Sequence, residues 1–87
     1  MSLILGTRLD GSSRPGFHAW LDGETAIVEL DSGAMLKLAE RATDAKLSNI
    51  LEEKRERISE AAMRLAREGF AARGGRGIEI LVTALDL

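Results

Sequence analysis

The chain has 87 residues, of which 45% are apolar and 30% are charged, and its formal net charge is −2. These values are typical of one small globular domain, and they argue against a disordered chain or a membrane span. The sequence contains no cysteine, which excludes disulfides and thiolate metal sites, and it does not begin with the pattern of a secretory signal. We therefore expect a cytoplasmic protein with a single domain over residues 1–87.

A short strand and a loop are expected at the start of the chain. The sequence SLIL at residues 2–5 predicts an edge strand. The stretch that follows, up to residue 16, is rich in turn residues and contains the only proline. Residues 1–16 are therefore expected to combine a short strand with a flexible loop.

The next segment, FHAWLDGETAIVELD, predicts a β-hairpin. Two alternating stretches flank Asp22 and Gly23, a pair that suits a type I′ turn. With these two residues as the loop, Trp20 pairs with Thr25, and alternate residues lie on opposite faces. One face carries Phe17, Ala19, Leu21, Ala26, Val28 and Leu30. The other carries His18, Trp20, Thr25, Ile27 and Glu29.

Two helices are predicted after the hairpin. Asp31 or Ser32 caps a first helix that ends near Ala42 and has one apolar stripe. A second cap at Thr43 and Asp44 begins a long helical pattern over 44–72, with a charged stretch that faces water. Its apolar side consists of Leu47, Leu51, Ile58, Ala62, Leu65 and Ala72.

The C-terminal sequence GIEILVTALDL predicts a closing strand. Its apolar positions Ile78, Ile80, Val82 and Ala84 alternate with Glu79, Leu81, Thr83 and Leu85. The elements then follow the order hairpin, two helices and closing strand, with an additional strand at the N-terminus. This order predicts an α+β fold with a small, mainly antiparallel sheet and helices packed on one face.

The sheet face that the helices leave uncovered is predicted to be unusually apolar. Because so few helices cover only one face, Trp20, Ile27 and Leu81 would contact water, with Leu85 and either Leu3 or Leu5 as further candidates. A homodimer that packs these faces or extends the sheet would bury them. We therefore predict an interface that includes Trp20, Ile27, His18 and Leu81.

A second candidate surface is the basic stretch REGFAARGGRGIEI. Residues 41–77 contain nine basic and six acidic groups, and four arginines lie near the end of the long helix: Arg64, Arg67, Arg73 and Arg76. A phosphate-binding loop would need glycines before a helix, whereas these glycines follow a helix and precede a strand. The stretch is therefore interpreted as a helix stop and a turn. Anion or nucleic-acid contact by the four arginines is the alternative, although the chain is acidic overall and has few aromatic residues.

No catalytic or cofactor site is predicted. His18 is the only histidine, and no nucleophile is placed beside a base. The helix carboxylates alternate with lysines and arginines, which is typical of a solvated surface and not of a metal site. We expect a protein that is not an enzyme and that needs no cofactor or metal.

Several segments resemble one family. They are MSLIL, FHAWLDGE, AIVELDSGAMLKL, RERISEAAMRLAREGF and IEILVTALDL, which together span nearly the whole chain. In these segments the chain resembles a small bacterial family of unknown function, number 1488 among such domain families. The resemblance implies a compact α+β domain of bacterial origin without assigned catalytic residues.

The sequence therefore favours a protein-interaction or regulatory module that acts as a homodimer and binds a protein partner. Nucleic-acid binding through the arginines is the alternative. Binding to a membrane is not expected.

Overall fold

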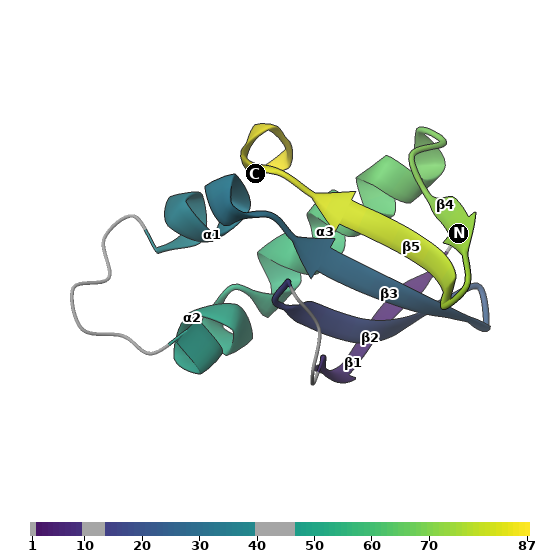
Figure 1. Ribbon diagram of the computed structural model, residues 1–87, viewed down its shortest axis with the longest axis horizontal. Coiled ribbons are helices and arrows are strands. Elements are labelled where there is room, and N and C mark those ends of the chain that lie inside the picture. The colour runs from purple at the N-terminus through teal and green to yellow at the C-terminus, as the bar shows by residue number, and fades with distance from the viewer. Residues whose placement is uncertain (1, 10–13, 40–46) are drawn as a thin grey trace.

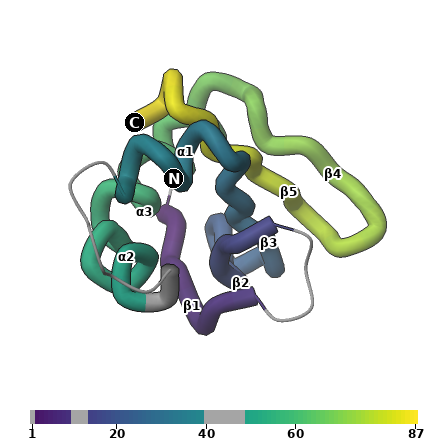
Figure 2. Tube along the Cα trace, turned by 60° about the vertical axis from the view of Figure 1, so that its left-hand side comes forward, coloured from purple at the N-terminus to yellow at the C-terminus, as the bar shows by residue number. Residues whose placement is uncertain are grey.

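Among the residues that the structure describes, five strands form one sheet in the order β1-β2-β3-β5-β4 (Figure 1 and Figure 2). The strands are β1 (Leu3–Arg8), β2 (Gly16–Leu21), β3 (Glu24–Leu30), β4 (Ala72–Gly74) and β5 (Gly77–Val82). This computed structural model describes residues 2–9, 14–39 and 47–87. The predicted N-terminal strand is therefore present, and it forms one edge of the sheet.

The helices pack on one side of this sheet. They are α1 (Ser32–Leu38), α2 (Leu47–Glu53) and α3 (Arg55–Arg67), followed at the C-terminus by the short 3-10 helix η1 (Ala84–Asp86). Helix α3 contacts β1 and β5 and crosses behind the sheet in Figure 1. The predicted α+β class is confirmed. Among the described residues, no helix is long and apolar enough to cross a membrane.

The hairpin of β2 and β3 has the predicted register. Trp20 pairs with Thr25, and the pairing continues along the strands to Gly16 and Glu29. The backbone angle φ is 51° at Asp22 and 83° at Gly23, as the left-handed conformations of a type I′ turn require. The turn residues therefore fix which side chains of the hairpin point into the core.

One of the four strand pairings in the described part of the chain is parallel. Strand β3 pairs in parallel with β5, whereas the other three pairings are antiparallel. Parallel neighbours need a long crossover, and the segment with helices α1 to α3 provides it. Strand β4 was not predicted. Ala72, which was expected on the long helix, instead lies in this edge strand and pairs with Glu79.

The long helix predicted over 44–72 is wrong in two respects. It is divided at Lys54 into α2 and α3, and α3 ends at Arg67. Gly69 follows with a φ of 87°, the left-handed conformation of a glycine that ends a helix. The closing strand is also shorter than predicted, because the chain turns into η1 after Val82. The predicted positions Ala42, Thr43 and Asp44 lie outside the described residues.

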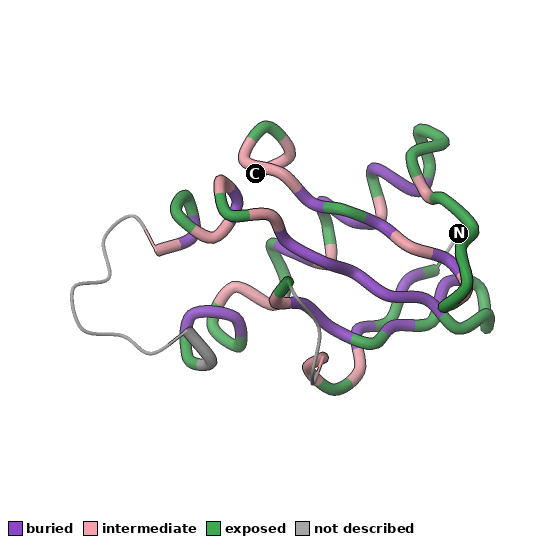
Figure 3. Tube along the Cα trace, in the orientation of Figure 1, coloured by how far each residue is buried: buried purple, intermediate pink, exposed green. Residues whose placement is uncertain are grey.

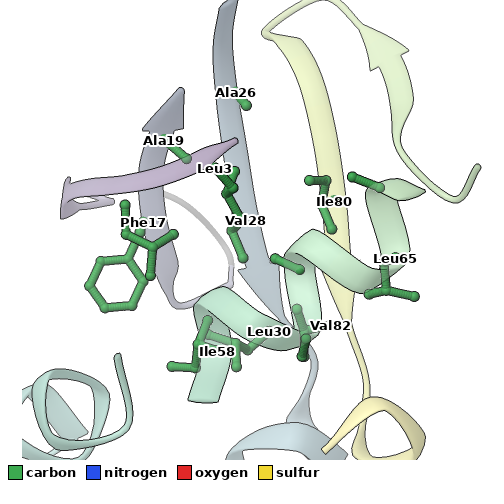
Figure 4. Packing of buried hydrophobic residues seen from close by; sticks show 14 of the residues in the cluster. Leu3, Phe17, Ala19, Ala26, Val28, Leu30, Ile58, Leu65, Ile80 and Val82 are labelled. Atoms are coloured by element: carbon green, nitrogen blue, oxygen red, sulfur yellow. The ribbon is translucent and has the colours of Figure 1, made fainter. Parts of the chain in front are cut away.

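The core lies between the sheet and the helices. Its largest fully buried side chains come from β2, β3, β5, α2 and α3, and most of them can be seen in Figure 4: Phe17, Val28, Leu30, Leu51, Ile58, Ile80 and Val82. Leu3 and Leu5 of β1 also belong to this core, so neither lies on the uncovered face. The central strand β3 is buried along most of its length, whereas β4 is exposed (Figure 3).

Candidate interaction face

The sheet face opposite the helices carries a mixed set of side chains. We call it the open face, and its members alternate along each strand with the core residues. They are Ile4, His18, Trp20, Thr25, Ile27, Glu29, Glu79 and Leu81.

Three large apolar side chains of the open face are accessible to solvent. The exposed fractions are 60% for Ile4, 46% for Trp20 and 40% for Leu81. Ile4 and Trp20 are register partners on β1 and β2. The Trp20 ring also lies over Gly6, where an added Cβ atom would be only 2.7 Å from the ring. Gly6 therefore leaves room for the indole to lie against β1.

The predicted interface residues do lie on one face, but they are not equally accessible. His18 and Trp20 are exposed on β2. Ile27, in contrast, is only 6% exposed, so its predicted exposure is wrong. Ile27 lies on the central strand between His18 and Glu79, and the neighbouring side chains cover it. Sequence reasoning missed Ile4, because no turn next to β1 fixes which of its residues point outward.

A charged cluster lies on the β3 and β5 side of the open face, where Glu29 is the register partner of Leu81. The Arg76 guanidinium donates to Glu29 at 3.0 Å and to Glu79 at 2.7 Å, and it thereby joins β3 to β5. Glu29 is the one buried charged residue in the described part of the chain. The hydrogen bonds to Glu79 and Glu29 raise the pKa of Arg76. Arginine is already charged at every working pH, so this shift makes stability no more sensitive to pH.

The four predicted anion-binding arginines do not form a single free cluster. Arg73 binds Glu24 at 3.0 Å, and this contact raises the pKa of its guanidinium. Arg64 donates to the Asp86 carbonyl at 2.6 Å, and Arg67 is exposed on α3.

Carboxylates therefore neutralise Arg73 and Arg76, and a C-terminal carbonyl holds Arg64. An arginine that is already paired has less charge to offer a phosphate. Nucleic-acid contact by this set stays a prediction from the sequence.

Arg55 was not singled out from the sequence. Its guanidinium donates to the carbonyl oxygens of Leu5 and Gly6 at 2.7 and 2.6 Å, and it lies 4.9 Å from the centre of the Phe17 ring. These contacts connect the first turn of α3 to the edge strand β1. The two segments lie far apart in the sequence and meet only in the folded chain. The charged run around Arg55 therefore did not indicate that this arginine contacts β1.

A groove of about 710 Å³ lies beside α1. The wall of the groove is mainly apolar. The carboxylate of Asp31 lies in this wall, but it already caps helix α1 by accepting a hydrogen bond from the Ala34 amide at 2.7 Å. The groove is lined by Arg14, Pro15, Leu30, Asp31, Ser32, Met35, Leu36 and Ala39. It brings together no acid, base and nucleophile. Among the described residues, no group of three or more histidine, aspartate and glutamate side chains is placed to hold a metal ion.

The fold and the open face define the chain as a small α+β protein with an uncovered, partly apolar sheet surface. No known protein family, curated protein or solved structure matches it. The resemblance to the bacterial family of unknown function therefore depends on the sequence segments alone.

Proposed function

We propose that the protein is a non-enzymatic interaction or regulatory module that acts as a homodimer through its open face. The observation that carries the proposal is the exposure of Ile4, Trp20 and Leu81 on the sheet face opposite the helices. Tryptophan is among the residues that contribute most to protein interfaces, because it buries a large area at a low cost in side-chain entropy. A second copy of the chain offers the same apolar residues and would remove both sets from water.

The size of the open face is compatible with a dimer. Strands lie about 4.8 Å apart and rise about 3.3 Å per residue, so five strands of this length present roughly 400 to 500 Å² in projection. Two such faces would together bury roughly 800 to 1,000 Å². That is the lower end of the range for specific interfaces, so the proposed dimer is expected to dissociate in the micromolar range.

Extension of the sheet is the less favourable way to pair two copies. The outer edge of β4 has only three residues. On the other edge, Arg55 occupies the carbonyl oxygens of Leu5 and Gly6. Short edge strands and charged side chains at an edge both oppose pairing with another strand. Packing of face on face instead uses the exposed apolar side chains of the open face, Ile4, Trp20 and Leu81.

Sedimentation of the purified chain between about 1 and 100 µM tests the proposal. We expect a monomer–dimer equilibrium, and we expect Trp20→Ala to weaken it at least tenfold, as for a central interface tryptophan. Phe70→Ala is the matched control: Phe70 is 67% exposed but lies after α3, away from the open face. A monomer at every concentration would refute the proposal, and so would equal effects of the two substitutions.

A further inference from the structure

We infer that Arg8 and Arg55 form a binding site for a carboxylate group beside the edge strand β1. The site lies on the helix side of the sheet, opposite the open face, so it does not depend on the proposed homodimer. The path of β1, the surroundings of the Arg8 side chain and the local balance of charge all point to this site.

A bulge in β1 turns Arg8 toward the core side of the sheet. The chain advances three residues from Leu5 to Arg8 on β1, but only two from Ala19 to Phe17 on β2. Because side chains alternate along a strand, the extra residue changes the face on which the following side chain lies. Arg8 therefore shares a face with its register partner Phe17, which is fully buried in the core (Figure 4). Without the bulge, Thr7 would lie on that face, whereas in the structure it is exposed.

The Arg8 side chain has a buried donor without a partner. Arg8 is partly buried, and its Nε atom is fully covered but makes no hydrogen bond. In the described part of the chain, no other buried side-chain nitrogen or oxygen lacks a partner in this way. An unsatisfied buried donor costs stability, and in native proteins such a group is commonly satisfied by a bound water or ion. The Arg8 guanidinium is therefore placed to bind a group from outside the chain.

Arg55 brings a second guanidinium to the same place. Its Cζ atom lies 4.9 Å from the centre of the Phe17 ring. Arg8 is the register partner of Phe17, and the Cβ atoms of such partners are about 5 Å apart. The Nη2 atom of Arg55 donates to two carbonyl oxygens at the bulge, which holds this side chain in position. Among the described residues, its Nη1 atom makes only a long contact of 3.4 Å with Glu52. Two guanidinium groups thus lie beside one aromatic ring.

The local charge favours a carboxylate over a phosphate. Among the described residues, Glu52 is the one carboxylate within ion-pair distance of either guanidinium. The two arginines and Glu52 together leave an excess of one positive charge. A carboxylate supplies one negative charge and accepts from a guanidinium through both oxygens, whereas a phosphate group carries about −1.5 to −2 at neutral pH. Arg8 and Arg55 are both partly accessible to solvent, so a ligand reaches them without opening the core.

An NMR titration of the complete chain with sodium acetate tests the site, with sodium chloride at the same ionic strength as the reference. We expect the Arg8 Nε–H signal and the amide signals around the bulge to shift and to saturate, with a dissociation constant of roughly millimolar size for so small a ligand. Sodium phosphate is titrated in the same way and should bind more weakly. Tighter binding of phosphate would overturn the assignment to a carboxylate, and shifts that saturate in neither titration would overturn the site.

A third titration distinguishes two sources of the carboxylate. A glutamate that is blocked at its amino and α-carboxyl groups presents its side chain as a protein does, and the side-chain carboxylate is its only charge. Binding that is much tighter than that of acetate would identify the ligand as an acidic side chain of a partner protein. Similar affinities would identify it as a small free acid. Both results agree with a carboxylate site.

Arg8→Met separates binding from folding. Methionine keeps much of the apolar stem of arginine and removes the donor that lacks a partner. Without acetate, we therefore expect the midpoint of urea denaturation to equal or exceed that of the native chain, and we expect the acetate shifts at the bulge to be lost. Arg67→Met is the matched control, because Arg67 is exposed at the opposite end of α3 from Arg55.

The outcomes for the two variants decide the inference. Arg67→Met should bind acetate like the native chain. If Arg8→Met also does so, Arg8 does not belong to a carboxylate site. A clearly lower midpoint for Arg8→Met without acetate would show that Arg8 stabilises the fold, and this too would contradict the inference.

Discussion

At the scale of single residues, Arg55 has more structural contacts than its position in a charged run suggests. Its side chain is 34% exposed, yet its guanidinium binds two carbonyl oxygens of β1 and covers the Phe17 ring. Hydrogen bonds from a charged donor contribute about 1.5 to 3 kcal/mol each to stability when they are shielded from water. Partial exposure lowers that value, and the contact with Phe17 adds to it.

We therefore expect Arg55→Ala to lower the free energy of unfolding by about 1 to 3 kcal/mol. Urea denaturation followed by circular dichroism measures the change. Glu52→Gln is the control, because it removes only the exposed contact between Glu52 and Arg55, and exposed ion pairs contribute about 0 to 1 kcal/mol. Equal midpoints for Arg55→Ala and the native chain would show that the link to β1 is not stabilising.

Gly69 and Gly75 offer a second comparison at the residue scale. Gly69 ends α3 with a φ of 87°, whereas Gly75 is not in the left-handed region. An L-residue in that region costs about 1 kcal/mol. We expect Gly69→Ala to destabilise the fold by about that amount and Gly75→Ala to have no measurable effect. Thermal denaturation of both variants checks this, and similar losses at the two sites would contradict it.

At the scale of elements, local signals predicted more than long-range ones. The Asp22-Gly23 turn determined the register of β2 and β3 because two residues specify the turn type. The division of the long helix at Lys54 had no such signal, since the surrounding residues all favour a helix. Strand β4 was also missed. Its three exposed residues lack apolar alternation, and its pairing with β5 exists only once the sheet has formed.

Helix α1 gives a prediction at the element scale. The Asp31 carboxylate accepts a hydrogen bond from the Ala34 amide at 2.7 Å. The amides in the first turn of a helix have no partner within the helix, so this contact satisfies one of them. Asp31→Ala is expected to lower the free energy of unfolding by about 0.5 to 2 kcal/mol, whereas Asp31→Asn, which keeps an acceptor, should lose much less. Amide exchange in α1 locates the effect. Unchanged exchange in Asp31→Ala would mean that the cap does not hold the helix.

At the scale of the whole molecule, the open face could be predicted but its details could not. Alternation within the hairpin assigned His18 and Trp20 to this face correctly. It could not show that Ile27 is covered, because burial on a central strand depends on neighbours from other parts of the chain. The charged cluster has the same origin: Arg76 meets Glu29 only because β3 and β5 are neighbours in the folded sheet.

The dimer also predicts an optical signal at the scale of the whole molecule. Trp20 is the only tryptophan of the chain and is 46% exposed in a single copy, so its fluorescence reports on the open face alone. Dimerisation would remove the indole from water, and the emission maximum should shift to shorter wavelength as the concentration rises. The midpoint of the shift should match the dissociation constant from sedimentation. In Leu81→Ser, which removes an apolar contact from the same face, the midpoint should move to higher concentration, whereas in Phe70→Ser it should not. An emission maximum that stays constant from below the dissociation constant to well above it would place Trp20 outside the interface, even if the chain were found to dimerise.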